Sequence, residues 1–74
     1  MKKVFKMQDL ECANCAAKME AMIAKIDGVE RASMNFMTQK LTLVISDDAK
    51  VEDILEEAGK ICRRIEPDCR ILGV

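Results

Sequence analysis

Histidine, tryptophan and tyrosine are absent from this chain of 74 residues, which contains one proline and three glycines. The lack of histidine removes the most common general base, and no nucleophile–base pair or phosphate-binding glycine loop is visible. Because Phe5 and Phe36 are the only aromatic residues, the core must be built from Ile, Leu, Val, Met and Ala. We therefore expect a small aliphatic domain that is not itself an enzyme.

Long apolar runs and clusters of one charge are missing as well. No apolar run approaches the roughly 20 residues that a membrane span needs, and no signal peptide is recognisable. Twelve basic and thirteen acidic residues give a net charge of −1, and no basic cluster exceeds Arg63-Arg64. We therefore expect residues 1–74 to form one domain that neither inserts into a membrane nor binds nucleic acid. The domain is nevertheless compatible with the N-terminal part of a longer membrane protein.

Hydrophobic periodicity predicts six elements of secondary structure. Alternation predicts strands at residues 3–8, 29–37, 40–45 and 69–72. Apolar spacings of three and four predict one helix over residues 13–26, ended by Asp27-Gly28. They predict a second helix over residues 51–65, started by Ser46-Asp47-Asp48 and ended by Pro67. This order predicts an α+β, ferredoxin-like βαββαβ sandwich, in which a four-stranded antiparallel sheet carries two helices on one face.

Cys12 and Cys15 stand between the first predicted strand and the first predicted helix. The first cysteine lies in the loop and the second in the opening turn of the helix, so both thiols can point at one ion. Free amides at the helix start favour the thiolate, which is the metal-binding form. Glu11, directly before Cys12, places a hard oxygen donor within reach of the same ion. The sequence therefore predicts a metal site formed by these three residues.

The other two cysteines are predicted to be core residues. Cys62 falls in the apolar stripe of the second helix, and Cys69 alternates onto the same face as Ile71. The chain is too regular in pattern for a disulfide scaffold, so we expect free thiols in a reducing compartment, the cytosol. Whether Cys69, or Glu66 and Asp68 in the loop before it, adds a further ligand stays open.

Residues 9–15, Asp-Leu-Glu-Cys-Ala-Asn-Cys, resemble the Gly-Met-Thr-Cys-x-x-Cys signature of the heavy-metal-associated domain. Gly28-Val29 and Asn35-Phe36 are further matches to that family, and the resemblance covers nearly the whole chain. The family occurs as soluble metallochaperones and as cytosolic N-terminal domains of heavy-metal P-type ATPases. The resemblance implies that Cys12 and Cys15 bind a metal ion.

The departures from that signature bear on the choice of metal. An acidic residue before the first cysteine, here Glu11 in place of Thr, is similar to the zinc, cadmium and lead exporters. In those proteins a carboxylate joins the two thiolates as a third ligand. Two thiolates satisfy copper(I), whereas zinc prefers about four ligands, and a ligand charge of −3 suits a divalent ion. Zinc or cadmium is therefore the favoured ion, with lead also possible and copper(I) as the alternative.

Three functions are compatible with these residues. The favoured hypothesis is a cytosolic regulatory or delivery domain of a zinc- or cadmium-exporting P-type ATPase. Its partners would be the transmembrane and other cytosolic domains of that ATPase, or another metal-binding domain, and ATP hydrolysis would belong to the rest of the protein. The first alternative is a freestanding copper(I) metallochaperone, in which Glu11 is incidental. The second is a small thiol-disulfide oxidoreductase that uses Cys12 and Cys15.

Overall fold

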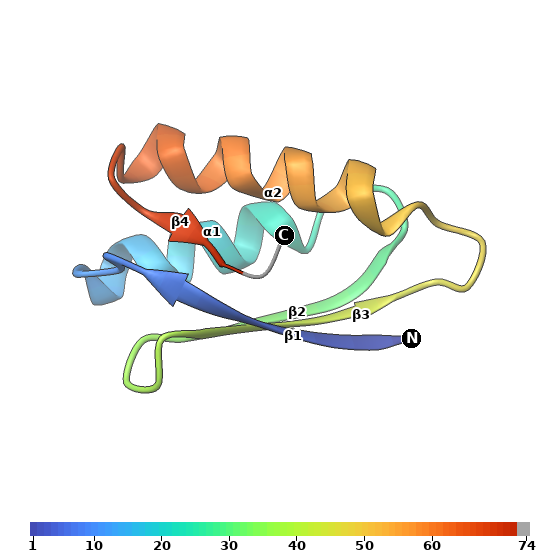
Figure 1. Ribbon diagram of the computed structural model, residues 1–74, viewed down its shortest axis with the longest axis horizontal. Helices are drawn as coiled ribbons and strands as arrows, with labels where there is room; N and C mark the ends of the chain where they lie inside the picture. Colours follow the sequence, from blue (N-terminus) through green and yellow to red (C-terminus); the bar gives the residue numbers. More distant parts are fainter. Residues whose placement is uncertain (73–74) are drawn as a thin grey trace.

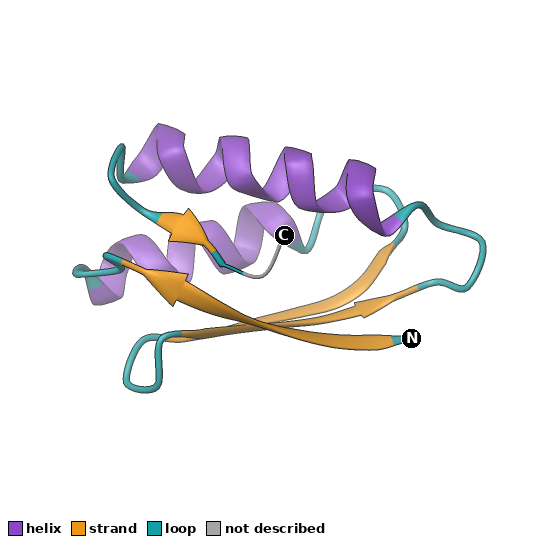
Figure 2. Ribbon diagram, in the orientation of Figure 1, coloured by secondary structure: helices purple, strands orange, loops and turns teal. Residues whose placement is uncertain are grey.

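The computed structural model describes residues 1–72, and its six elements follow the predicted order. The strands are β1 (Lys2–Gln8), β2 (Val29–Asn35), β3 (Lys40–Ile45) and β4 (Arg70–Ile71). The helices are α1 (Ala13–Ile23) and α2 (Val51–Ile65), and both lie on the same face of the sheet (Figures 1 and 2). The strand order is β2-β3-β1-β4 with antiparallel neighbours, which confirms the ferredoxin-like prediction. No helix formed by residues 1–72 has the length and apolarity to cross a membrane.

The core lies between the sheet and the two helices. Leu41, Leu43 and Ile45 of the central strand β3 alternate onto the helix-facing side, and their side chains are fully buried. Met19 and Ile23 of α1 are equally buried against them. Burial of each such side chain contributes about 1.5–3 kcal/mol, so this layer is the main source of stability. The inward faces that alternation and helical spacing predict are confirmed.

Helix α1 ends at Ile23, three residues before the predicted end. The main chain tightens there, because Lys25 N–H donates to Met22 O and Ile26 N–H donates to Ile23 O. Gly28 then reverses the chain with φ +95°, and a Cβ atom at this position would lie 2.8 Å from the Cβ of Ala49. The position therefore requires glycine, as predicted, although the helix stops earlier than its apolar pattern.

Strand β2 ends at Asn35 rather than at residue 37. Asn35 pairs with Lys40 across the hairpin, so the connection has four residues, 36–39, instead of two. The side-chain Oδ1 of Asn35 accepts a hydrogen bond from Thr38 N–H at 3.0 Å. Gln39 closes the turn in the left-handed region with φ 56°. The longer turn explains why no Asn-Gly or Asp-Gly pair is needed here.

The prediction that Ser46-Asp47-Asp48 starts the second helix is wrong. Helix α2 spans Val51–Ile65, which confirms the predicted bounds, but its N-cap residue is Lys50, which makes no side-chain cap hydrogen bond. The negative charges that favour the helix start are instead Glu52 and Asp53 in its first turn.

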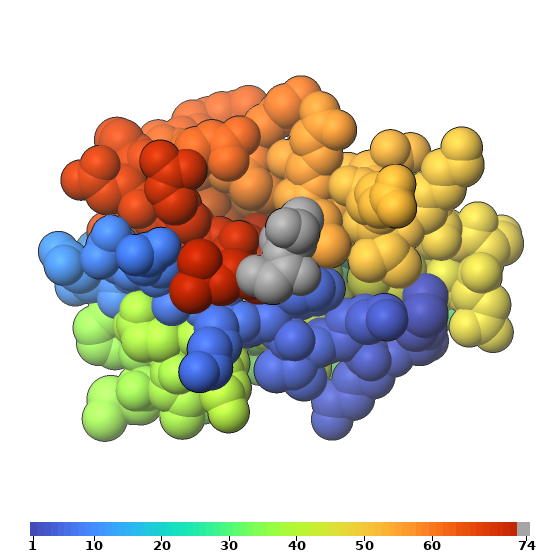
Figure 3. Space-filling model, viewed as in Figure 1, coloured from blue at the N-terminus to red at the C-terminus, as the bar shows by residue number. Residues whose placement is uncertain are grey.

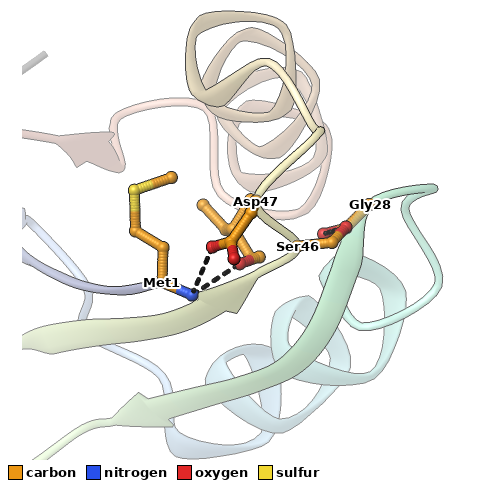
Figure 4. A network of polar contacts seen from close by, with 5 residues as sticks. Met1, Gly28, Ser46 and Asp47 are labelled. Carbon is orange, nitrogen blue, oxygen red and sulfur yellow. Dashed lines mark hydrogen bonds and ion pairs between the residues drawn. The ribbon is translucent and has the colours of Figure 1, made fainter.

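The polar groups of Ser46 and Asp47 join three segments at the end of the sheet, as Figure 4 shows. Ser46 Oγ donates to Gly28 O at 3.2 Å, and Ser46 N–H donates to the same oxygen at 2.9 Å. The N-terminal ammonium of Met1 lies 3.7 Å from a carboxylate oxygen of Asp47 and donates to Ile45 O at 2.8 Å. These tertiary partners replace the helix cap that the local sequence predicts.

Candidate metal centre

Cys12 is the N-cap residue of α1. Its main chain is extended, with φ −128° and ψ 117°, and its Sγ accepts a hydrogen bond from Cys15 N–H at 3.1 Å. Its carbonyl oxygen accepts from Ala16 N–H at 3.0 Å, the first bond of the helix. The sulfur thus takes the role that serine or aspartate oxygens usually play at a helix start. Both thiols are free and half-buried, so the predicted pair is brought together at the N-terminus of α1.

The two thiols have different acidities. Hydrogen bonds from the thiol and then the main-chain N–H of Cys15 lower the pKa of Cys12. The same thiol–thiol hydrogen bond, with the loss of solvent and the charges of Cys12 and Glu66, raises the pKa of Cys15 to about 11. Cys12 therefore loses its proton first, and a metal ion bound by both sulfurs must displace the proton of Cys15.

The α2–β4 connection lies beside the cysteine loop. In Figure 3 the red residues of this connection lie against the blue residues of the β1–α1 loop. A cavity of about 380 Å³ separates the two segments. It is lined by Asp9, Glu11, Ile65, Glu66, Pro67 and Asp68. Four of these six residues carry carboxylates, and one of them, Glu11, directly precedes Cys12.

Glu66 is the carboxylate most closely associated with both thiols. Its negative charge acts to raise the pKa of Cys12 and Cys15, and also that of the buried Cys62 and Cys69. Its Oε1 atom is buried and has no hydrogen-bond partner among residues 1–72. A buried, unpaired carboxylate oxygen is unfavourable unless a cation or donor satisfies it. The sequence places Glu66 in the right loop but does not reveal this burial.

Glu11 and Asp9 occupy the other wall of this cavity. Glu11 is exposed, and within residues 1–72 no three His, Cys, Asp or Glu side chains form a ready metal cluster. The structure thus pairs Cys12 with Cys15, while Glu11 as a third ligand stays a prediction. Asp9 is exposed with φ 59°, a left-handed conformation that glycine adopts most easily. That conformation gives a physical reason for the glycine at this place in the family signature.

Cys62 and Cys69 are both fully buried, which confirms that they belong to the core. Burial, together with the neighbouring Cys69, raises the pKa of Cys62 to about 12. Burial also raises the pKa of Cys69. Buried thiols of this kind are protonated at neutral pH and react slowly. The half-buried pair, Cys12 and Cys15, therefore differs from the fully buried pair in access to solvent.

The fold places an accessible pair of thiols at the start of a helix, and carboxylates line a cavity in the neighbouring loops. These features are typical of a small metal-binding domain. The comparison with protein families agrees: residues 4–62 match the heavy-metal-associated domain, and the chain belongs to that family.

Its relatives include transport ATPases. The chain is 43% identical over 56 residues to a cadmium-transporting ATPase of Staphylococcus aureus, covering 76% of this chain and 7% of that protein. It is 38% identical over 58 residues to a probable cadmium-transporting ATPase of Listeria monocytogenes, covering 78% of this chain and 8% of that protein. The chain thus spans less than a tenth of the length of these two relatives.

A solved relative carries a different metal. It is the N-terminal domain of a potential copper-translocating P-type ATPase from Bacillus subtilis in the Cu(I)-loaded state. Its solution structure superposes with a TM-score of 0.70 at 33% identity, covering 81% of this chain and 76% of that one. Family membership therefore establishes a heavy-metal-binding domain, and the residues around the thiols must distinguish one ion from another.

Proposed function

We propose that this domain binds zinc or cadmium, and also lead, through Cys12 and Cys15 in the cytosol. Its role is to deliver the ion to a heavy-metal-exporting P-type ATPase of which it forms a part, or to regulate that pump by its occupancy. The observation that carries the proposal is the pair of accessible thiols at the start of α1, where Cys15 N–H donates to Cys12 Sγ at 3.1 Å. The buried, unpaired Oε1 of Glu66, whose charge acts on both thiols, supports a divalent ion. The names of the cadmium-transporting relatives support the same class of ion.

The donor set suits a divalent ion of borderline softness. Two thiolates and one carboxylate carry a charge of −3, and the carboxylate supplies the oxygen that zinc accepts and copper(I) does not need. Glu11 lines the cavity from the cysteine loop and Glu66 from the α2–β4 connection. We propose that one of them, Glu11 in the first place, moves to complete a three-ligand set when the ion binds. Water then fills the fourth position of a tetrahedral site.

The position of the thiols supports transfer of the ion. Cys12 and Cys15 are half-buried at the N-terminus of α1, and this end of the helix lies at one end of the molecule (Figure 1), where the thiolate of a partner can attack the bound ion. Ligands then exchange one at a time, so the ion is never released into solution. The partner is the transmembrane part or another cytosolic domain of the ATPase, or a second metal-binding domain.

A copper(I) metallochaperone is the alternative function. The copper-loaded ATPase domain from Bacillus subtilis, at 33% identity, supports copper(I) as the ion of this alternative. Two thiolates alone satisfy copper(I), so in this alternative Glu11 and Glu66 contribute charge and no bond to the metal.

Competition titrations against chromophoric chelators test the proposal. The wild-type domain is compared with the double variant Cys12→Ser/Cys15→Ser for Zn²⁺, Cd²⁺ and Cu(I). We expect one Zn²⁺ or Cd²⁺ per domain, and a loss of at least about a hundredfold in affinity in the variant. Tight binding of Cu(I) without measurable binding of Zn²⁺ or Cd²⁺ would favour the metallochaperone instead.

A further inference from the structure

We propose that Gln39 is the positioning residue of the metal site: from the β2–β3 turn, its side-chain amide holds the loop that carries Cys12. This inference rests on the proposed metal-binding function, because it concerns the geometry of the same thiol pair. Gln39 lies 29 residues from its partner in the loop, Leu10, which precedes Cys12 by two positions.

One side chain satisfies both main-chain polar groups of Leu10. Gln39 Nε2 donates to Leu10 O at 2.7 Å, and Gln39 Oε1 accepts from Leu10 N–H at 3.2 Å. The second hydrogen of Nε2 is donated to Phe36 O at 2.9 Å, within the turn itself. The carbonyl oxygen of Gln39 also accepts from Met7 N–H at 2.7 Å, at the end of β1. The NH₂ group and the oxygen of the amide are therefore both used. Through Gln39 the turn is bonded to Met7, near the end of β1, and to Leu10, in the loop before Cys12.

The loop has few other constraints. Within the described residues 1–72, and apart from regular strand and helix pairing, residues 9–11 make only two hydrogen bonds, and both are to Gln39. The side chain of Leu10 is 2% exposed, so it anchors the loop in the core without fixing the orientation of its peptide groups. The bidentate amide supplies that orientation. It thereby directs the chain toward Cys12 and the start of α1.

The backbone of Gln39 gives an independent reason to assign it a role. Its φ of 56° lies in the left-handed region, which is unfavourable for a residue other than glycine. Glycine or asparagine would fit the turn better on conformational grounds. A glutamine at this position is explained by what its side chain binds, because asparagine has the same amide with a shorter reach and glycine has no side chain.

The consequence is a metal loop ordered before the ion arrives. A loop that is already oriented loses less conformational entropy on binding, so removal of the bonds should weaken binding and speed release. The matched variants are Gln39→Gly, which relieves the backbone and removes the amide, and Gln39→Asn, which keeps the amide and shortens its reach. The control is Asn35→Ala, which removes the Asn35–Thr38 bond of the same turn without touching Leu10.

The experiment measures two quantities in each purified domain: the hydrogen-exchange rate of the Leu10 amide without metal, and the dissociation constant for Cd²⁺. We expect both Gln39 variants to show Leu10 exchange and a Cd²⁺ dissociation constant about tenfold higher than wild type. Asn35→Ala should leave both quantities within about twofold of wild type, even where its unfolding midpoint falls.

Unchanged Leu10 exchange in Gln39→Gly would overturn the proposal, and so would unchanged Cd²⁺ affinity in a variant whose Leu10 exchange is faster. An equal loss of affinity in Asn35→Ala would reduce Gln39 to a structural part of the turn and overturn it too. A wild-type domain that fails to bind Cd²⁺ is a different result. It would overturn the proposed function, and the positioning role would fall with it.

Discussion

The sulfur of Cys12 accepts a hydrogen bond from the main-chain N–H of Cys15 at 3.1 Å, so the first thiol of the pair caps the helix that carries the second. This contact makes the two thiols unequal. The pKa of Cys12 is lowered, whereas the pKa of Cys15 is raised to about 11, so Cys15 keeps its proton at neutral pH. An ion that binds both sulfurs therefore exchanges places with at least one proton.

Metal affinity should consequently rise with pH. The metal-free domain carries the Cys15 proton throughout the neutral range and the metal-bound domain does not, so raising the pH favours the bound state. We expect the apparent association constant for Zn²⁺ to increase at least about tenfold per pH unit between pH 6 and 8. Chelator competition at several pH values, corrected for the titration of the chelator, measures the slope. A flat profile would contradict the assignment of the second thiol as a protonated ligand.

Glu66→Gln should change thiol reactivity and metal affinity in opposite senses. The charge of Glu66 acts to raise the pKa of both site thiols, so its removal should increase the thiolate fraction of Cys12 and speed alkylation. The same change removes a candidate ligand, so Zn²⁺ and Cd²⁺ should bind about tenfold more weakly. Asp68→Asn is the matched control, because Asp68 lines the same cavity and is exposed. Faster alkylation with unchanged affinity would leave Glu66 outside the ligand set.

The order of elements and the inward faces could be predicted because they depend on local periodicity. Leu41, Leu43 and Ile45 alternate, and the stripe of α2 repeats at helical spacing, whatever the rest of the chain does. The end of α1 and the groups that cap α2 could not be predicted in this way, although the bounds of α2 were. Ser46 and Asp47 are good caps in isolation, but Gly28 O and the N-terminal ammonium bind them instead.

In the metal site, too, features set by local sequence could be predicted and those set by distant segments could not. The spacing of Cys12 and Cys15 predicts their proximity, because a loop and the first turn of a helix always bring such residues together. The burial of Glu66 Oε1 and the bonds from Gln39 to Leu10 depend on segments that are far apart in the sequence. No pattern within a single element indicates those contacts.

The four cysteines should separate clearly by reactivity. In the native metal-free domain, we expect iodoacetamide to modify Cys12 first, and Cys62 at least about a hundredfold more slowly, because Cys62 is fully buried with a pKa of about 12. Added Zn²⁺ should protect Cys12 and leave the slow reaction unchanged. Mass spectrometry of peptides at timed intervals measures each site, and a denatured sample is the control. Modification of Cys62 at the rate of Cys12 would show that the buried pair is not part of a stable core.

Glu11→Ala tests the choice of ion. Glu11 adjoins Cys12 and faces the carboxylate-lined cavity, so its side chain can reach an ion held by the two thiols without any change in the sheet. For Zn²⁺ or Cd²⁺ the carboxylate adds a ligand and replaces a water molecule, whereas for copper(I) it adds little. We expect Zn²⁺ and Cd²⁺ to bind about tenfold more weakly, or about 1.4 kcal/mol, and copper(I) affinity to change much less.

The informative quantity is the loss of Zn²⁺ or Cd²⁺ affinity in Glu11→Ala compared with the loss of copper(I) affinity. Glu30→Ala is the control, since it removes the same charge from an exposed position on β2. If zinc and copper(I) lose affinity equally, Glu11 acts through its charge alone, and Glu30→Ala should show a smaller loss of the same kind. If the affinity for zinc and cadmium is unchanged in Glu11→Ala but falls in Glu66→Gln, the third ligand comes from the α2–β4 connection. Loss in neither variant would leave two thiolates as the whole protein ligand set, which is the set that copper(I) prefers.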